Sequence, residues 1–312
     1  MRNYSIDTLK TICAILIIFI HTPKTEIMQE CVAPFFRCAV PLFFMISGYF
    51  TYGKSNLNNV IRKRIIGQLK ILGWGMALYF IISVITNGTT TIDKMHHFLT
   101  PSFFLFNTVP YAGHLWYIIA YIYVLVFMLI VEKYNLYTPL FITTPFLLLG
   151  TLVTGTYSGI LLNNSLPFHF SRNFFFTGIP FFTLGMIIKH YKQTPTIPFL
   201  TIATIAFYII GLVEVSFIGV FAGDCYFSTI FLSVFIFLLF INIKQPNDTV
   251  FSRLGREDSL YIYVLHFFIA DIVRKYTTTF PSLQYISTPL VLCLTLLLII
   301  LLRKTKIIGK II

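Results

Sequence analysis

The sequence contains few charged residues, and acidic residues are the scarcest of them. Only 11% of its 312 residues are charged, and Asp and Glu together number 11. A soluble domain of this length has about 25% charged residues. No polar stretch is long enough to enclose a soluble core. A soluble domain is therefore excluded anywhere in the chain.

Cysteine is also sparse, and its spacing fits no disulfide framework or metal motif. The five cysteines are odd in number and show no CxxC spacing. Cys31 and Cys38 both fall near the predicted outer face and could pair, but isolated buried thiols are the favoured interpretation. No small-x-small cleavage site follows the first apolar run, so we expect that run to be retained.

Long apolar runs make up most of what remains, since 57% of the residues are hydrophobic. Runs of this length predict membrane-spanning helices, because strands of membrane barrels are about ten residues long and alternate in polarity. The predicted fold is an all-α, polytopic membrane protein forming one domain over 1–312. Its ten predicted spans are 8–22, 34–52, 68–86, 114–131, 138–154, 173–189, 197–213, 224–242, 258–273 and 286–302.

The net charge of +12 is explained by the membrane, and nucleic acid is not an expected partner. Most of the 23 Lys and Arg residues fall in alternate loops and at both termini. Cytoplasmic loops carry this excess of positive charge, so both termini are predicted to be cytoplasmic. The longest outer segments are then 87–113 and 155–172, whose polar residues suit a surface that meets a polar acceptor.

The first span carries ionisable residues on one face. Lys10 and His21 are eleven residues apart, close to three helical turns, which corresponds to a rise of about 16 Å. Asp7 lies on the same stripe and can pair with Lys10 at i,i+3 spacing. His21 is predicted to lie deep in the span. Because an ionisable group in a membrane is costly unless it is satisfied or used, His21 is predicted to be functional.

Four motifs in order carry a resemblance to a known family. They are Asp7-Thr-Leu-Lys10 with His21, Pro41-Leu-Phe-Phe-Met-Ile-Ser-Gly48, Gly113-His-Leu-Trp-Tyr117 and Ser259-Leu-Tyr-Ile-Tyr-Val-Leu-His266. With them the chain resembles the acyltransferase-3 family of integral-membrane acyltransferases over essentially its whole length. It is also similar to the membrane module of the vancomycin-resistance serine racemases. One departure from the family's Arg-x-x-Arg pattern is that Arg64 is followed at that spacing by Gly67.

The resemblance implies transfer of an acyl group, with acetyl as the first choice, from cytoplasmic acyl-CoA to a hydroxyl of a glycan or cell-envelope precursor. It makes His21 the base or acyl relay, with Lys10 and Asp7 beside it. An interhelical hydrogen bond is the plainer alternative for His21, and an interfacial lysine for Lys10. Acetyl-CoA would be a co-substrate, and we expect no metal: His96 and His97 are adjacent and lack a third ligand.

Further residues are candidates for substrate contacts, and each also has a structural alternative. Donor contacts are predicted from a basic run between the second and third predicted spans and from the last motif. For the basic run, the alternatives are a topology anchor or contact with lipid, and for the last motif the alternative is helix packing. The predicted donor contacts are Arg62, Lys63, Arg64, Lys70, Tyr263 and His266. Acceptor contacts are predicted at the outer face, where the alternative is an aromatic or basic interface anchor: His114, Trp116, Tyr117 and Arg172.

A rival function remains at this stage, namely a small-solute, serine-like transporter or an export partner without acyl transfer. The polar stripe would then be a proton-coupled path. In either case the expected location is the cytoplasmic membrane of a bacterium, in contact with its lipids. The sequence leaves the oligomeric state, the acceptor and the acyl chain open.

Overall fold

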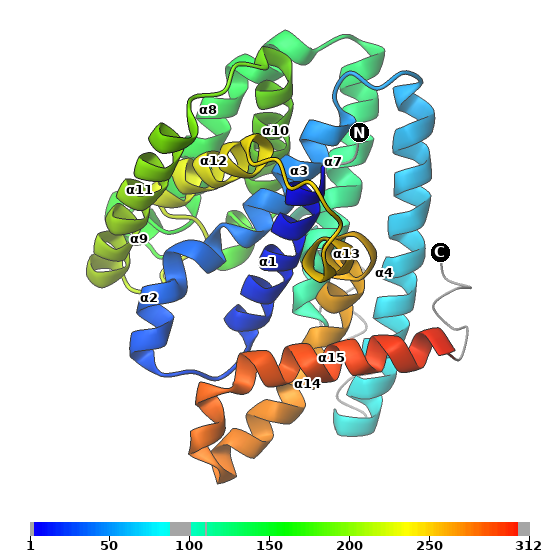
Figure 1. Cartoon of the computed structure of the whole chain (residues 1–312), viewed down its shortest axis with the longest axis vertical. Helices are drawn as coiled ribbons and strands as arrows, with labels where there is room; N and C mark the ends of the chain where they lie inside the picture. Colours follow the sequence, from blue (N-terminus) through cyan, green and yellow to red (C-terminus); the bar gives the residue numbers. More distant parts are fainter. Residues whose placement is uncertain (1–2, 88–100, 110, 305–312) are drawn as a thin grey trace. The chain divides into compact units, whose positions relative to one another are not determined.

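The computed structural model describes residues 3–87, 101–109 and 111–304, and the regular elements within these ranges are helices (Figure 1). His96 and His97 lie outside the described residues. Within them the five cysteines are free: Cys13, Cys38 and Cys225 are buried, whereas Cys31 and Cys293 are exposed. Cys31 and Cys38 therefore form no disulfide, and the prediction of buried thiols holds for three of the five.

Within the described residues, seven helices are long and apolar enough to span a membrane: Tyr4–His21, Glu26–Thr51, Leu57–Thr86, Gly113–Lys133, Tyr137–Thr154, Ile197–Ile218 and Ser287–Lys304. The other three predicted spans, 173–189, 224–242 and 258–273, also fall on helices. One of these helices has only 16 residues, and another carries Asp271, Arg274 and Lys275. The helical fold is confirmed, whereas the count of ten and the orientation of the termini remain predictions.

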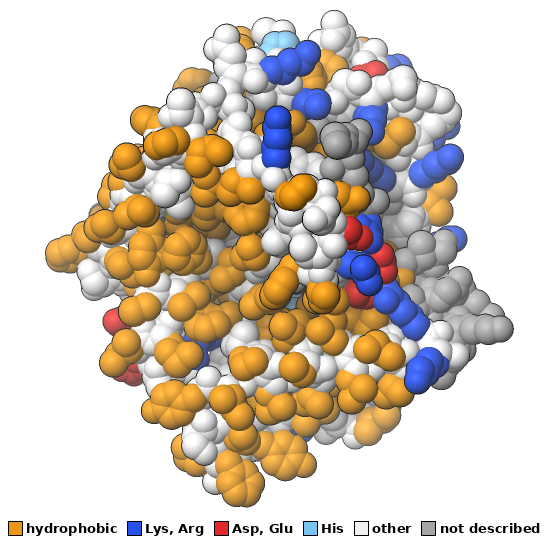
Figure 2. Space-filling view, viewed as in Figure 1, with side chains coloured by type: hydrophobic (Ala, Val, Ile, Leu, Met, Phe, Trp, Pro, Cys, Tyr) orange, Lys and Arg blue, Asp and Glu red, His pale blue; other side chains and the backbone are white. Residues whose placement is uncertain are grey.

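Large apolar side chains cover much of the face shown in Figure 2. Phe217 is 86% exposed, Ile85 78% and Ile27 74%. An extended apolar surface of this kind is unfavourable in water and suits the hydrocarbon of a bilayer. The surface thus agrees with the helix lengths in indicating a multi-pass membrane protein.

The chain divides into two compact units, and the first comprises Met1–Ile46 with Tyr191–Ile307. Its described helices are α1 (Tyr4–His21), α2 (Glu26–Arg37), the first part of α3 (Ala39–Thr51), α11 (Ile197–Ile218), α12 (Phe227–Asn242), α13 (Val250–Glu257), α14 (Ser259–Thr279), η5 (Pro281–Tyr285) and α15 (Ser287–Lys304). Helix α1 packs against α13, α14 and α15, and α11 lies beside α12 and α2 (Figure 1). The first unit is therefore built around the helix that carries Lys10 and His21.

A buried ion pair helps to hold the first unit together. Arg37 is 8% exposed and contacts Asp224 at 2.6 Å. Its guanidinium also donates to the backbone oxygen of Val220 at 2.7 Å. Because a buried guanidinium without partners is costly, these contacts fix the end of α2 against the segment between α11 and α12.

The second unit is built on Ser47–His190. It contains the end of α3, α4 (Leu57–Asn87), α6 (Pro101–Phe106), η2 (Gly113–Leu115), α7 (Trp116–Lys133), α8 (Tyr137–Thr154), α9 (Ser158–Leu161), η3 (Phe168–Phe170), the π-helical turn η4 (Phe174–Gly178) and α10 (Ile179–Tyr191). Helix α4 packs along α7, and η4 packs against α7 and α8. A Cβ on Gly48 would lie 1.9 Å from the Phe182 carbonyl oxygen, so the small residue permits close approach of α3 to α10.

Candidate functional site

Helix α1 begins with a side-chain cap and ends at the predicted catalytic histidine. The side chain of Asn3 accepts a hydrogen bond from the backbone nitrogen of Ile6 at 3.2 Å, which satisfies one of the free N–H groups of the first turn. Asp7 lies in that turn, where a carboxylate is favourable. The helix ends at His21, immediately before Thr22 and Pro23. The imidazole therefore lies at the end of α1 and is half-buried, and its depth in the membrane stays a prediction.

The predicted pair between Asp7 and Lys10 is present. The Lys10 Nζ atom is 2.9 Å from Asp7 Oδ1, with side-chain exposures of 26% and 6% respectively. An ammonium has three N–H donors, and this contact uses one of them. Lys10 can therefore remain paired with Asp7 and still donate to a phosphate oxygen.

Helix α13 packs across α1 beside this pair. A Cβ on Gly255 would lie 1.8 Å from the backbone oxygen of Asp7. The hydroxyl of Thr11 donates to the Phe251 backbone oxygen at 2.6 Å, and the hydroxyl of Thr8 donates to Gln245 Oε1 at 2.9 Å. These contacts hold α13 and the segment before it against the polar half of α1.

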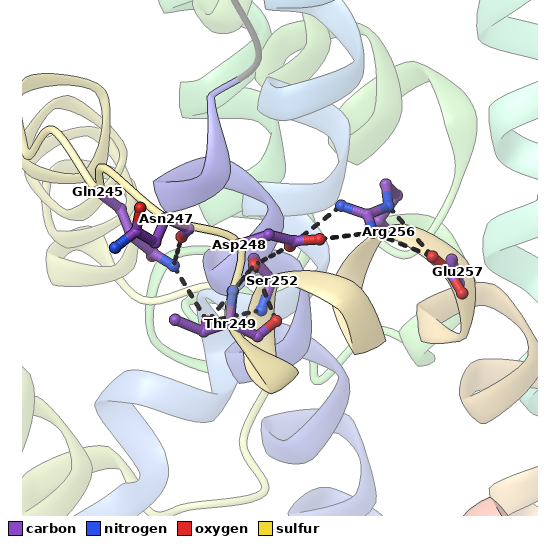
Figure 3. A network of polar contacts seen from close by, with 7 residues as sticks. All are labelled: Gln245, Asn247, Asp248, Thr249, Ser252, Arg256 and Glu257. Carbon is purple, nitrogen blue, oxygen red and sulfur yellow. Dashed lines mark hydrogen bonds and ion pairs between the residues drawn. The ribbon is translucent and has the colours of Figure 1, made fainter.

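A polar network fixes α13 in turn (Figure 3). Arg256 contacts Asp248 at 2.9 Å and Glu257 at 3.0 Å, and the Ser252 hydroxyl donates to Asp248 at 2.6 Å. These hydrogen bonds, from Arg256 above all, lower the pKa of Asp248 to about 2, so the network stays charged at neutral pH. No pattern in the sequence indicates that α13 packs against Asp7.

His21 lies against two rings of α14. Its ring centroid is 5.3 Å from that of His266 and 5.2 Å from that of Phe267. His266 is fully buried, and its Nδ1 lies 3.0 Å from the Ile262 backbone oxygen. Because a carbonyl only accepts, Nδ1 carries the proton there, which leaves Nε2 as an acceptor in the neutral ring. The structure thus brings His266, predicted as a donor contact, beside the predicted base.

Two cations bind the carbonyl end of α1. Arg274 donates to the His21 backbone oxygen at 2.9 Å and pairs with Asp271 at 2.7 Å. The ammonium of Lys24 donates to the backbone oxygens of Thr22, at 2.7 Å, and Phe19. Cations are favourable at a helix C-terminus, where the last carbonyls lack partners in the helix. These contacts fix the position of the residue that carries the imidazole, and sequence reasoning did not find them.

Burial, with Arg274 and Arg37 nearby, lowers the pKa of Lys24 to about 8 from its ordinary value of 10.5. Between these two values the unfolded chain retains a proton that the folded chain has released, so stability rises with pH. We expect the thermal unfolding midpoint of the parent to rise from pH 8 to pH 10.5 relative to that of Lys24→Met. The exposed Lys275→Met is the control, and parallel pH curves for the parent and Lys24→Met would contradict the prediction.

The predicted basic run lies on α4, in the second unit. Arg62, Lys63 and Lys70 are exposed. Arg64 is half-buried and donates to the hydroxyl of Thr51. Tyr263, like His266, is buried on α14 in the first unit. The predicted donor contacts therefore form two groups, one in each unit, and each is described by itself.

A pocket of about 380 Å³ lies in the second unit between the ends of the two predicted outer segments. The walls are formed by Phe106, Asn107, Thr108, Val109, Gly113, Trp116, Pro167, Phe168, His169 and Arg172. Two of the four predicted acceptor residues, Trp116 and Arg172, are among them. The guanidinium carbon of Arg172 is 5.9 Å from the Trp116 ring centroid and 5.0 Å from that of Phe168.

The other two predicted acceptor residues are not in the wall of this pocket. His114 is 5% exposed, with its ring 4.6 Å from that of Tyr79 on α4. Tyr117 is 7% exposed and stacks on Tyr121, one turn along α7, at 6.0 Å. Successive residues at a helix start point in different directions, so Gly113 and Trp116 of this motif line the pocket whereas His114 and Tyr117 do not.

Sequence reasoning missed Asn107, Phe168 and His169. Each falls at the end of a segment that the sequence predicts as a polar-acceptor surface, which was the available signal. What no pattern could give is the hydrogen bond that joins the segments: the Phe174 backbone nitrogen donates to Asn107 Oδ1 at 3.1 Å. This contact spans 67 residues of sequence.

The helices and the site define an integral-membrane protein with a polar stripe on its first helix. Comparisons with known proteins agree with this class. A family model described as an acyltransferase domain, Acyl_transf_3, matches residues 3–304. The chain therefore belongs to the acyltransferase-3 family, and the resemblance seen in the motifs is confirmed. Family membership supports acyl transfer in a membrane as its class of activity.

A curated relative is an amino-acid racemase of Enterococcus faecalis, 28% identical over 314 residues. The alignment covers 91% of this chain and 43% of the relative, so the chain spans less than half of the relative's length. No solved structure matches the chain.

Proposed function

We propose that this protein transfers an acyl group, with acetyl as the first choice, from cytoplasmic acyl-CoA to a hydroxyl of a glycan or cell-envelope precursor. The proposal rests on one structural observation within a family of acyltransferases. A single helix, α1, carries a half-buried imidazole at its end and a paired ammonium about three turns earlier. The proposed location is the cytoplasmic membrane of a bacterium.

In the proposed reaction, His21 removes the proton of the acceptor hydroxyl as its oxygen attacks the thioester carbonyl. The tetrahedral intermediate collapses, the carbon–sulfur bond breaks, and the imidazolium returns the proton to the leaving sulfur. A relay is the second form of the same proposal. The imidazole attacks the thioester carbonyl, the carbon–sulfur bond breaks, and coenzyme A leaves as a thiol with the imidazole proton. The acyl-histidine then passes the acyl group to the acceptor hydroxyl, whose proton returns to the imidazole. In both forms His266 and Phe267 hold the imidazole ring, and Arg274 holds the backbone beneath it.

Charged groups at the other end of the stripe suit the donor. Lys10, oriented by Asp7, is proposed to contact a phosphate of acyl-CoA as a point charge. In the second unit, further donor contacts are proposed at the exposed cations of α4: Arg62, Lys63 and Lys70. Arg64 in the second unit and Tyr263 in the first are proposed as structural supports, each within its own unit, because Arg64 binds Thr51 and Tyr263 is buried.

On the acceptor side, Trp116 and Arg172 are proposed to contact the glycan in the pocket of the second unit. His114 packs on Tyr79 and Tyr117 stacks on Tyr121, so both are proposed to support the start of α7. The alternative function is a small-solute transporter or an export partner, which the similarity to part of an amino-acid racemase allows. Such a protein has no reason to bind acyl-CoA, so donor binding separates the two functions.

The first experiment measures binding of acetyl-CoA to protein purified in detergent. The parent should bind saturably. Lys10→Met should raise the dissociation constant about tenfold, because a hydrogen bond to a charged group contributes about 1.5 kcal/mol or more. Lys133→Met is the matched control, since Lys133 is an exposed lysine at a helix end that contacts none of the proposed groups.

The result has a clear opposite. Folded protein that shows no saturable binding at millimolar acetyl-CoA would exclude the acyltransferase proposal. Uptake assays in vesicles, beginning with serine, would then test the transporter.

A further inference from the structure

Helix α13 lies between two predicted spans and is too short to be one itself. Its eight residues, Val250–Glu257, correspond to a length of about 12 Å, whereas the hydrocarbon core of a bilayer is about 30 Å thick. The predicted span 224–242 ends shortly before α13, and the predicted span 258–273 starts directly after it. On α1, helix α13 contacts Asp7 and Thr11, at the start of the first predicted span. These three neighbours indicate that α13 lies at one surface of the membrane.

One side of α13 exposes large apolar side chains. Val250 is 68% exposed and Phe251 is 54% exposed, and Leu254, one turn after Val250, is half-buried. With 3.6 residues per turn, these three side chains lie within an arc of about 100° on the helix. An exposed apolar arc is unfavourable in water, and on a helix with a charged opposite side it is typical of a helix that lies in the membrane interface.

The other side of α13 is fixed to the protein. Ser252 and Gly255 are buried, and Gly255 lies against the backbone of Asp7. The Thr249 side chain caps the helix by accepting from the Ser252 backbone nitrogen at 3.3 Å, and the polar network around Arg256 holds its charged side (Figure 3). The helix therefore cannot rotate to bury its apolar arc. Its exposed side chains are oriented before any partner binds, which lowers the entropy cost of binding.

Two cations near the apolar arc are left without a carboxylate partner. The three carboxylates of 244–258 are each bound by an arginine, either Arg256 or Arg303. Lys244 and Arg253 are exposed, and in the part of the chain that the structure describes neither forms a hydrogen bond or an ion pair through its side chain. Arg253 follows the exposed valine of α13 by three residues, so the two side chains are neighbours on the helix surface. The exposed arc thus has positive charge at its edge.

We propose that α13 lies in the membrane interface and binds an anionic phospholipid. Val250 and Phe251 enter the region of the acyl chains, Arg253 pairs with the lipid phosphate, and Lys244 adds positive charge. The partner is a lipid because a water-soluble phosphate would leave the apolar arc uncovered. The predicted orientation of the termini makes this the cytoplasmic leaflet. A basic residue near an anionic membrane surface raises affinity about fivefold, so two of them give a clear preference for anionic over zwitterionic lipid.

Fluorescence quenching tests the proposal. The two native tryptophans are removed by Trp74→Phe and Trp116→Phe, and Phe251→Trp introduces a single reporter on α13. The full chain is placed in nanodiscs of phosphatidylcholine with a small, fixed fraction of brominated lipid, because bromine quenches tryptophan on contact. Brominated phosphatidylglycerol should quench at least about twice as strongly as brominated phosphatidylcholine at the same fraction. Bromine near the head group should quench more than bromine near the chain end, because an interfacial helix enters only about 5–10 Å.

Variants separate the two parts of the surface. Arg253→Gln combined with Lys244→Gln should remove the preference for phosphatidylglycerol and leave quenching by phosphatidylcholine unchanged. Lys275→Gln, at an exposed lysine of α14, is the charge control and should keep the preference. Phe217→Trp in place of Phe251→Trp is the position control: Phe217 is 86% exposed on α11, so both brominated lipids should quench it to the same extent. Unchanged thermal unfolding of each variant shows that its fold is intact.

Three results would overturn the inference. The first is no quenching at position 251 by either lipid while position 217 is quenched, which would place α13 in water. The second is equal quenching by the two lipids, or a preference that survives loss of both cations. The third is a preference that acetyl-CoA abolishes, which would assign the cations to the donor. The inference does not depend on acyl transfer, so His21→Ala should leave the quenching and its lipid preference unchanged.

Discussion

His21→Ala is expected to lose acyl transfer by about 10²–10⁴-fold, the usual contribution of a positioned proton-transfer group. Binding of acetyl-CoA should be unchanged, because the proposed donor contacts lie at the other end of α1. Turnover is measured as release of free coenzyme A thiol in the presence of acceptor. His190→Ala is the matched control, since His190 is an exposed histidine that bonds to Tyr52 in the second unit.

Added imidazole separates loss of the base from loss of structure. It should restore part of the turnover of His21→Ala, because a free imidazole can occupy the vacated space beside His266 and Phe267. Kinetics that follow a ping-pong pattern in the parent would favour the acyl-histidine relay over the direct base. Full activity of His21→Ala would remove His21 from the mechanism.

The second large effect is expected on stability. Gly255→Ala would place a methyl group 1.8 Å from the Asp7 backbone oxygen, in contact with backbone that cannot rotate away. Overpacking of this kind typically costs about 1–3 kcal/mol, and backbone contact puts this site at the upper end or beyond. We expect a clear fall in the thermal unfolding midpoint, with weaker donor binding as α13 moves off the pair of Asp7 and Lys10.

Gly67→Ala is the control for this substitution. A Cβ at Gly67, within α4, meets no atom within 4 Å in the described part of the chain beyond the adjoining backbone of its own helix. Alanine is favoured over glycine in a helix by up to about 1 kcal/mol, so this variant should be neutral or more stable. Equal behaviour of the two alanine variants would show that α13 is not packed on α1 as described.

The sequence predicts those parts of the fold that depend on local periodicity. The stripe of Asp7, Lys10 and His21 is predicted from 3.6 residues per turn, and the contact between Asp7 and Lys10 confirms the pairing of those two residues. The apolar runs locate the helices because each run is long enough to form a membrane-spanning helix. Helix α14 is less apolar than a lipid-facing span. Its Arg274 binds the last carbonyl of α1, and its Asp271 pairs with Arg274.

Contacts between distant segments could not be predicted. His266 meets His21 across 245 positions of sequence through the packing of α14 on α1, and no periodicity encodes such a pairing. The pocket is an intermediate case. Its segments are predicted as acceptor surfaces, and Trp116 and Arg172 are identified by residue type, but Asn107 enters only through its hydrogen bond to Phe174.

The length of α1 between Lys10 and His21 has a consequence for selectivity. A helix is stiff along its axis, so these two side chains define a fixed interval of about 16 Å. A donor whose phosphates bind Lys10 and whose thioester reaches His21 would be selected by the distance between its phosphates and its thioester. The helix would then select the coenzyme A carrier by its length. The acyl group extends past His21, so its length would be selected by other residues.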